Sequence, residues 1–433
     1  MTTRRRRGRA ADVPVCGASA TSAPAEAPPG RPSARPRGVR VSRDAWIALA
    51  IGVLAASAYL VTSSRDRENL DYFVRLASAF LDGRIHLTEA PSWLTELIPR
   101  DGVWYVAYPP MPAVVLVPFV VVLGPDLHQQ IASALFGGVA VGLTYLVLCR
   151  SALAERVRVL LALVFAFGTC FFYVAEAGNT WYLSHVVAVL FATAAILLAL
   201  QRRWPLVVGL LLGCAVLSRL PVVLTAPFYV AMLVGLGWPL RMPVDRRAAL
   251  RSTVLFGAGL AVPLAILAAY DVARFGSPFE LGYALIPGVL QEPYYQEGIF
   301  SISYLPRHVY ALFFRSWNWS DAFPWITPSW WGLALLLTTP LFLWLLKARP
   351  RDPRVLYAAI AVGLTLIPLV THGNVGFTQF GYRFSLDLQP LLFVILATVF
   401  ERGMSRLAVA AAVLSIVFSS YGVWAIGAGY VSF

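Results

Sequence analysis

The stretch Ser64–Arg84, SRDRENLDYFVRLASAFLDGR, is a polar and amphipathic segment between two strongly apolar regions of the chain. Its second half places apolar side chains on one stripe at helical spacing, which predicts an amphipathic helix over 70–80. The stripe consists of Leu70, Phe73, Leu76, Ala77 and Phe80. Asp82-Gly83-Arg84 then ends the helix, because glycine is a common C-terminal stop. Since about three helical turns are too short to cross a bilayer, we expect this helix to lie in the membrane interface.

The rest of the chain is strongly apolar. Of 433 residues, 58% are hydrophobic and only 13% are charged, and apolar runs of membrane-spanning length recur. These runs lack the alternation of a lipid-facing barrel, so helices are the expected spanning elements. We predict an all-α polytopic membrane protein with about eleven transmembrane helices. The runs lie at about 45–62, 131–149, 159–175, 184–200, 205–217, 221–237, 253–271, 330–346, 355–370, 385–400 and 405–425.

The distribution of basic residues predicts the topology. The apolar run 111–124 has only 14 residues, a length more typical of re-entrant than of spanning segments. If it does not cross, the connections at 150–158, 201–204, 238–252, 347–354 and 401–406 share one side and hold 15 Lys and Arg against 4 Asp and Glu. The opposite face carries more acidic than basic residues. The positive-inside tendency therefore favours a re-entrant 111–124, a cytoplasmic N-terminus, and large outer segments at 63–130 and 272–329.

The formal charge of +13 also reflects the N-terminal tail. Ten of the 35 basic residues lie in the first 44 positions. We expect residues 1–43 to be a disordered, basic cytoplasmic tail, because they contain too few large apolar side chains to offset the entropy of ordering. Residues 44–433 form the membrane domain. Basic residues placed beside apolar runs indicate topology, so we do not expect nucleic acid to be a partner.

Three carboxylates follow directly after the first predicted span. Asp66, Glu68 and Asp71 lie within six residues, just before the interfacial helix. A carboxylate held at the membrane surface can remove a proton from an acceptor hydroxyl or amine within hydrogen-bond reach. The alternative is that they are solvated loop acids.

Two arginines lie at predicted outer ends of spans. Arg219 follows a short apolar run in Ser218-Arg219-Leu220-Pro221, and Arg383 stands in Gly381-Tyr382-Arg383. Arginine binds phosphate oxygens bidentately, although arginines at helix ends also reach lipid headgroups. His185, at the outer start of another span, is a candidate ligand for phosphate or, together with a loop carboxylate, for a divalent metal. The four cysteines show no metal-binding spacing. Because His185 remains a candidate ligand, metal dependence is left open.

The order of these features resembles the GT-C class of integral-membrane glycosyltransferases, in particular the branch of protein O-mannosyltransferases and lipid A aminoarabinose transferases. The shared features are the acidic cluster, the segment from Tyr72 to Gly83, Tyr108-Pro109-Pro110 before a short apolar run, and Ser218-Arg219. Leu76 to Arg84 also matches the pattern Leu-Ala-x-Ala-Phe-Leu-x-Gly-Arg of bacterial members. The resemblance is good over about 45–240 and loose beyond.

The resemblance implies an inverting transferase in a bacterial inner membrane. Such enzymes move a sugar from a polyprenyl-phosphate carrier to a lipid, glycan or protein acceptor on the outer face. A loop acid serves as base, and basic or polar groups hold the phosphate.

Carried over to this chain, the resemblance places the base at Glu68, four residues before Tyr72. A second acid common in the family is replaced by Asn69, so Glu68, Asp66 and Asp71 all stay candidates.

The phosphate side departs from the family pattern. The basic residue expected before the double proline is replaced by Tyr108, which offers a hydrogen bond but no charge. Arg219 then has to supply more of the charge, with His185, Arg383 and Arg84 as further candidate donor ligands.

Two other functions fit a polytopic membrane protein. A secondary transporter would place ionisable residues on broken helices near the bilayer midplane, whereas the predicted spans are almost free of them. A lipid-carrier polymerase or ligase would use the same outer face and differ mainly in its acceptor.

Overall fold

The computed structural model describes residues 42–63, 70–242, 244–376 and 378–432. Most of the predicted tail lies outside these ranges, as do Asp66 and Glu68. Ser42 and Arg43, which we assigned to the tail, instead begin the first helix: the Ser42 side chain accepts a hydrogen bond from the amide of Ala45 and caps the helix.

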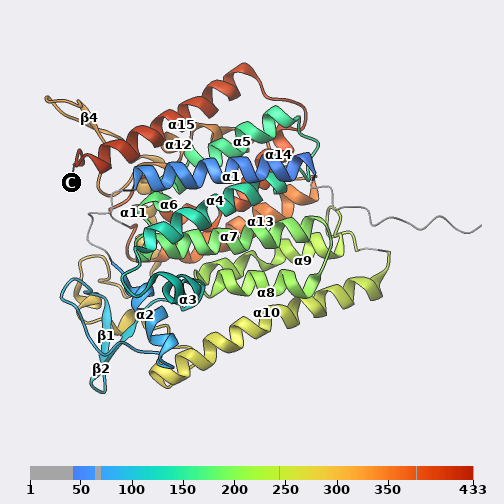
Figure 1. Cartoon of the computed structure of the whole chain (residues 1–433). Coiled ribbons are helices and arrows are strands. Elements are labelled where there is room, and N and C mark those ends of the chain that lie inside the picture. Colours follow the sequence, from blue (N-terminus) through green and yellow to red (C-terminus); the bar gives the residue numbers. More distant parts are fainter. Residues whose placement is uncertain (1–41, 64–69, 243, 377, 433) are drawn as a thin grey trace, which may run out of the picture. The chain divides into compact units, whose positions relative to one another are not determined.

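The described domain is a bundle of helices with short strands at one end (Figure 1). The α-helices are α1 (Arg43–Thr62), α2 (Tyr72–Leu81), α3 (Met111–Leu123), α4 (Gln129–Leu148), α5 (Glu155–Phe167), α6 (Phe171–Ala177), α7 (Thr180–Leu200), α8 (Pro205–Val216), α9 (Ala226–Val234), α10 (Arg246–Phe275), α11 (Leu305–Phe313), α12 (Leu335–Thr338), α13 (Pro353–Thr371), α14 (Gln389–Phe400) and α15 (Arg406–Gly427). The strands are β1 (Leu97–Arg100), β2 (Val103–Val106), β3 (Asn318–Trp319) and β4 (Ile326–Thr327). The 3₁₀ helices are η1 (Leu220–Thr225), η2 (Tyr283–Leu285), η3 (Val289–Gln291), η4 (Ile302–Tyr304), η5 (Pro340–Lys347) and η6 (Arg383–Asp387).

The number of spanning helices differs from the prediction of about eleven. Among the described residues, six helices are long and apolar enough to cross a membrane, namely α1, α4, α7, α10, α13 and α15. A seventh is obtained if α5 and α6, which are bent by 53°, form one span. The predicted runs 205–217, 221–237 and 385–400 correspond to shorter apolar helices.

The predicted span 330–346 is not a continuous α-helix. It contains the four-residue α12, then Thr339 in a non-helical conformation (φ −133°, ψ 75°), then η5. Pro340 explains the interruption, because proline lacks an amide donor and disfavours the helical conformation in the residue before it.

The segment that connects α1 to α4 begins and ends at the same end of the bundle, because α1 and α4 run antiparallel. A Cβ on Gly142 would approach Ala48, one on Gly138 would approach Gly52, and one on Gly137 would approach Tyr59, so the two helices run antiparallel. A segment 111–124 that does not cross requires this arrangement. Its re-entrant placement in a bilayer stays a prediction.

The basic connections meet at one end of the bundle. Arg43 pairs with Glu155 at 2.8 Å, and Arg354 pairs with Glu401 at 2.8 Å. The amide of Ala152 also donates to Glu401 at 3.3 Å. The connections 150–158, 347–354 and 401–406 therefore lie together, and we predict that they face the cytoplasm.

Cysteine labelling tests this orientation. In a variant whose native cysteines are replaced by serine, we expect Ala90→Cys to react with a membrane-impermeant thiol reagent added outside, and Ala154→Cys to be protected. Both alanines are exposed in the structure, and Ala154 lies in a basic connection. The opposite labelling pattern would show that the bundle is inserted the other way round.

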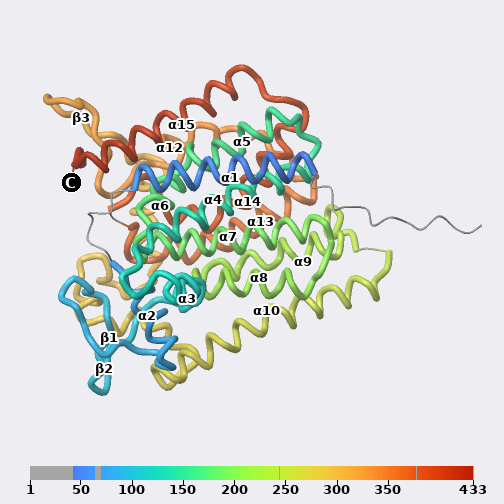
Figure 2. Tube along the Cα trace, in the orientation of Figure 1, coloured from blue at the N-terminus to red at the C-terminus, as the bar shows by residue number. Residues whose placement is uncertain are grey.

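The opposite end of the bundle carries α2, α3 and the β1–β2 hairpin (Figures 1 and 2). The amphipathic helix predicted over 70–80 is confirmed as α2, and Gly83 follows it with a φ of +71°. The domain is mostly helical, as the predicted all-α class implies, and it also contains a short hairpin in which β1 and β2 pair in antiparallel register around Asp101 (φ 53°) and Gly102 (φ 78°). Positive φ at both central residues is the requirement of a type I′ turn, one of the two common two-residue hairpin turns.

Glycines bring α8 and α10 into backbone contact. A Cβ on Gly209 would lie 2.1 Å from the carbonyl oxygen of Phe256, and one on Gly259 would lie 2.0 Å from that of Leu206. Backbone atoms cannot rotate away as a flexible side chain can, so the two helices can approach this closely only with glycine at both positions.

We expect Gly259→Ala to lower stability by about 1–3 kcal/mol, because the added methyl group forces the two backbones apart. Gly257→Ala, two residues away in α10, is the matched control: nothing lies within 4 Å of its Cβ position, so it should be neutral or stabilising. Thermal unfolding of the two variants in detergent measures the difference. Equal unfolding temperatures would contradict the proposed contact.

Candidate functional site

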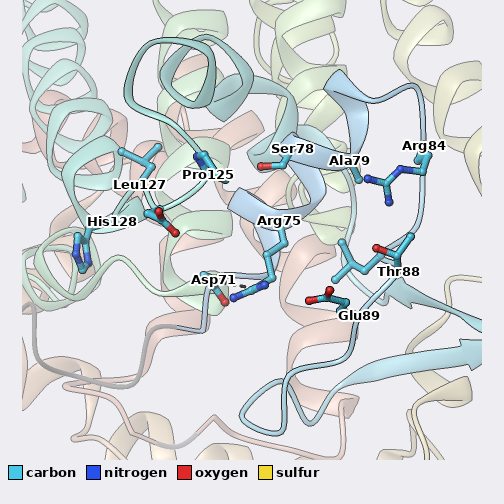
Figure 3. Close-up of a pocket in the computed structure, with 12 residues that line it drawn as sticks. Asp71, Arg75, Ser78, Ala79, Arg84, Thr88, Glu89, Pro125, Leu127 and His128 are labelled. Carbon is cyan, nitrogen blue, oxygen red and sulfur yellow. Dashed lines mark ion pairs between the residues drawn. The ribbon is translucent and has the colours of Figure 1, made fainter.

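Asp71 and Arg84, two of the predicted site residues, line an open cavity beside α2 (Figure 3). The cavity has a volume of about 560 Å³ and is lined by Asp71, Arg75, Ser78, Ala79, Arg84, Leu87, Thr88, Glu89, Pro125, Asp126, Leu127 and His128. Asp71 pairs with Arg75 at 3.0 Å, and Arg84 pairs with Asp82 at 2.5 Å. Both of these charges are therefore locally paired.

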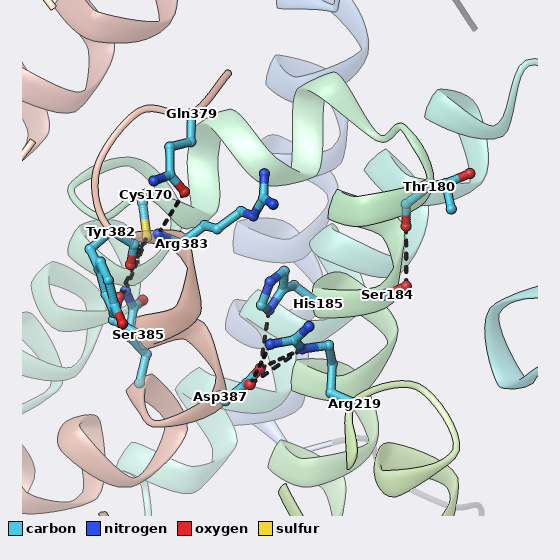
Figure 4. Close-up of polar contacts among 11 residues, drawn as sticks. Cys170, Thr180, Ser184, His185, Arg219, Gln379, Tyr382, Arg383, Ser385 and Asp387 are labelled. Atoms are coloured by element: carbon cyan, nitrogen blue, oxygen red, sulfur yellow. Dashed lines mark hydrogen bonds and ion pairs between the residues drawn. The ribbon is translucent and has the colours of Figure 1, made fainter. Parts of the chain in front are cut away.

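Arg219 and His185 meet at a carboxylate that we did not select from the sequence. Figure 4 shows their side chains converging on Asp387, at the end of η6. Arg219 donates from Nε (3.2 Å to Oδ1) and from Nη2 (2.9 Å to Oδ2), so it binds Asp387 with two nitrogens. Nδ1 of His185 lies 3.0 Å from Oδ1. The cluster joins the ends of α7, α8 and η6.

Asp387 is ionised in this cluster. Burial alone would raise its pKa, but the neighbouring Arg219 and His185 outweigh burial and lower the pKa of Asp387 to about 2. Because an ionised carboxylate only accepts hydrogen bonds, Nδ1 of His185 has to carry the proton. Asp387 is thus a buried anchor (1% side-chain exposure), whereas the Arg219 side chain is 22% exposed.

Arg383 approaches the same aromatic ring as Arg219, that of Phe384. The guanidinium carbons of Arg219 and Arg383 both lie 5.4 Å from the centre of the Phe384 ring. Arg383 is buried and also lies over Trp181, at 5.6 Å from the ring centre. The structure therefore brings together two of the three arginines that we selected from the sequence as donor ligands, about 160 residues apart along the chain, whereas Arg84 lies at the cavity beside α2.

Tyr108 belongs to a second cluster that adjoins the first through Trp181. The Tyr108 hydroxyl donates to Oε2 of Glu96, and the Trp181 indole N–H donates to the same oxygen at 2.8 Å. Trp181 also lies 2.7 Å from the Tyr108 hydroxyl. Since a tyrosine hydroxyl has one proton, Tyr108 in this arrangement orients Glu96 and has no proton left for a phosphate.

Glu96 is a half-buried carboxylate just before β1. Burial raises the pKa of the Glu96 carboxyl above its ordinary value, although the hydrogen bonds from Tyr108 and Trp181 and the charge of Arg383 act in the opposite direction. Among the described residues, no hydrogen bond to its other oxygen, Oε1, is found. A carboxylate with one oxygen held and a raised pKa has the properties of a general base.

No metal ligand set is found in the described part of the chain. Nowhere in these ranges do three or more His, Cys, Asp or Glu side chains come together as metal ligands would. Among the residues that the structure describes, the carboxylate that pairs with His185 is that of Asp387.

Solved structures with a similar fold include two of ArnT from Cupriavidus metallidurans. With the undecaprenyl phosphate complex, the TM-score is 0.50 at 13% identity, covering 89% of this chain and 65% of ArnT. With apo ArnT, it is 0.50 at 15% identity, covering 83% and 60%. This chain has an ArnT-like fold. The resemblance to GT-C membrane glycosyltransferases is thereby confirmed for the fold, and the protein is a mostly helical, multi-pass membrane protein.

The ArnT-like fold is not matched by sequence similarity. No family model matches the chain, and no curated protein matches it either. The S. cerevisiae protein O-mannosyltransferase Pmt1-Pmt2 complex bound to the sugar donor aligns with a TM-score of 0.38 and 15% identity over 62% of this chain and 37% of that chain. The chain spans about 65% of the length of ArnT.

Proposed function

We propose that this protein is a glycosyltransferase that moves a sugar from a polyprenyl-phosphate-linked donor to a lipid, glycan or protein acceptor on the outer face of a bacterial inner membrane. The ArnT-like fold supports this proposal, because ArnT itself binds undecaprenyl phosphate. The carrier is a lipid, so its isoprenoid tail can lie between the apolar helices while its phosphate stays at the membrane surface.

The observation that carries the proposal is the pair of arginines around Phe384. Arg219 donates to Asp387 through Nε and Nη2, which leaves Nη1 for another acceptor. Arg383 adds a second guanidinium beside the same ring, 5.4 Å from its centre. Two guanidinium groups near the polar end of a membrane bundle form a binding site suited to a phosphate, whose oxygens arginine matches in geometry and charge.

The reaction needs two kinds of group. As the bond between the sugar C1 and the phosphate oxygen breaks, its electron pair leaves with the phosphate, and Arg219 and Arg383 stabilise the growing charge. On the opposite face of the sugar, the acceptor oxygen or nitrogen forms the new bond to C1 and gives its proton to a carboxylate. This geometry inverts the configuration at C1.

Four carboxylates are candidates for the base. Asp66, Glu68 and Asp71 come from the sequence, and only Asp71 lies within the described residues, paired with Arg75. Glu96 comes from the structure, through its link by Trp181 to Arg383. His185 holds Asp387 and thereby Arg219. Tyr108 orients Glu96. Arg84 stays a candidate for contact with the donor headgroup at the cavity beside α2.

The test is transfer by the wild-type protein in proteoliposomes. Polyprenyl-phosphate donors carrying different labelled sugars are offered with envelope lipids, glycans and proteins as acceptors. We expect one donor to be cleaved, with free polyprenyl phosphate appearing in the same amount as the glycosylated product. Movement of the intact donor across the bilayer without cleavage would favour a transporter, and products that keep the carrier would favour a polymerase. Failure to cleave any donor would contradict the proposal.

A further inference from the structure

A second cavity lies at the basic end of the bundle, where η5, α13, α14 and α15 meet. Its volume is about 390 Å³, and it is lined by Trp344, Lys347, Arg349, Asp352, Thr398, Val399, Phe400, Glu401, Arg402, Gly403 and Ser405. Two of these helices, α13 and α15, are candidate membrane spans and begin beside the cavity. The cavity is therefore at the depth of the lipid headgroups if both helices cross.

The charges of this cavity do not balance. Its acids, Asp352 and Glu401, both pair with Arg354, at 2.6 Å and 2.8 Å. Three other cations line it, namely Lys347, Arg349 and Arg402, and all three are exposed. Because the two acids are already shared with Arg354, the cavity as a whole attracts anions.

Two exposed leucines stand within two residues, along the chain, of side chains that line the cavity. Leu346, in η5, is 87% exposed, and Leu407, in the first turn of α15, is 71% exposed. The Lys347 ammonium lies 5.5 Å from the centre of the Trp344 ring, so its stem runs along an aromatic face. Cations beside exposed leucines match a molecule that has both an anionic head and hydrocarbon chains.

We propose that this cavity binds the headgroup of an anionic phospholipid, with its phosphate at Lys347, Arg349 and Arg402 and its acyl chains along the exposed leucines. The site is separate from the arginine pair at the other end of the bundle and does not depend on the proposed transferase activity. Each cation near an anionic membrane surface contributes about a fivefold gain in affinity. The three together give a site selective for phosphatidylglycerol or cardiolipin over neutral lipids.

Lys347 is the single lysine of the whole chain, so its reactivity reports on this cavity alone. The protein is reconstituted in phosphatidylcholine vesicles with or without phosphatidylglycerol. The vesicles are permeabilised so that an amine-reactive ester reaches both faces of the membrane. Modification of Lys347 is then followed by mass spectrometry. A second, exposed lysine is introduced by Arg246→Lys at the same end of the bundle, outside the cavity, to correct for the general effect of an anionic surface.

We expect phosphatidylglycerol to slow modification of Lys347 at least fivefold more than that of the introduced lysine. Arg349→Gln and Arg402→Gln, both at exposed positions, should each weaken this protection by about fivefold. Equal slowing of the two lysines would overturn the proposal. Protection by inorganic phosphate in phosphatidylcholine vesicles, to the same extent as by phosphatidylglycerol, would also overturn it, because it would identify a site for free phosphate.

Discussion

Replacing Arg219 by glutamine is expected to lower kcat/KM for sugar transfer by about 10²- to 10³-fold. In the variant, the departing phosphate loses one of the two guanidinium groups that lie beside Phe384, at the point where negative charge develops. Arg251→Gln, on the exposed surface of α10, is the matched control and should leave transfer unchanged. Transfer is measured in proteoliposomes under donor-limiting conditions.

A double variant separates this effect from loss of stability. Arg219→Gln alone leaves the buried Asp387 carboxylate without its bidentate partner, which costs roughly 3 kcal/mol. Adding Asp387→Asn replaces that charge with a neutral amide, so the unfolding temperature should rise again while transfer stays low. If transfer recovered together with stability, Arg219 would be a structural residue and its assignment to the phosphate would be wrong.

Glu96→Gln is expected to reduce kcat by about 10²-fold or more with little change in donor binding, because glutamine keeps the shape of the side chain but cannot take a proton. The pH dependence gives a second readout. Wild-type activity should fall as the pH drops through the pKa of Glu96, which burial holds above its ordinary value, because protonation removes the base. The Glu96→Gln variant should not show this decrease in activity at acidic pH.

The other carboxylates are the comparison for Glu96. Asp71→Asn, Asp66→Asn and Glu68→Gln test the candidates chosen from the sequence, and Asp101→Asn, in the exposed turn of the hairpin, is the control. If Glu96→Gln kept the wild-type kcat and the wild-type decrease in activity at acidic pH, while Glu68→Gln lost both, the base would be Glu68. A large rise in KM for the donor in Glu96→Gln, at unchanged kcat, would instead make Glu96 a sugar-binding residue.

The membrane fold and the amphipathic helix were predictable from residue patterns. Hydropathy located the long helices, and the stripe from Leu70 to Phe80 predicted α2 nearly to its ends. The number of spans was not predictable in this way, since a run of apolar residues such as 330–346 can be broken by one proline at its centre. Apolar composition reports where a segment is buried more reliably than it reports a continuous helix.

The β1–β2 hairpin was not predicted, although the sequence contains a pattern that indicates it. Asp101-Gly102 is a strong two-residue turn, and it lies between the short segments Leu97–Arg100 and Val103–Val106. Counting outward from that turn pairs Leu97 with Val106, which brings Glu96 towards Tyr108. The sequence could therefore have selected Glu96 as a partner of Tyr108.

The partners of Arg219 could not be predicted. Asp387 is 168 positions away along the chain, and its contact with Arg219 depends on how α7, α8 and η6 come together at one end of the bundle. Local patterns contain no information about such a pairing. Arg219 and Arg383 could each be selected from the sequence as an arginine at the end of a predicted span. That both lie beside Phe384 could be learned only from the fold.

The central claim is that the carrier phosphate binds between Arg219 and Arg383. A structure of the protein with bound polyprenyl phosphate measures this directly. We expect the phosphate oxygens within hydrogen-bond distance of both guanidinium groups, beside Phe384. A phosphate bound instead at Arg75 and Arg84, in the cavity beside α2, would contradict it.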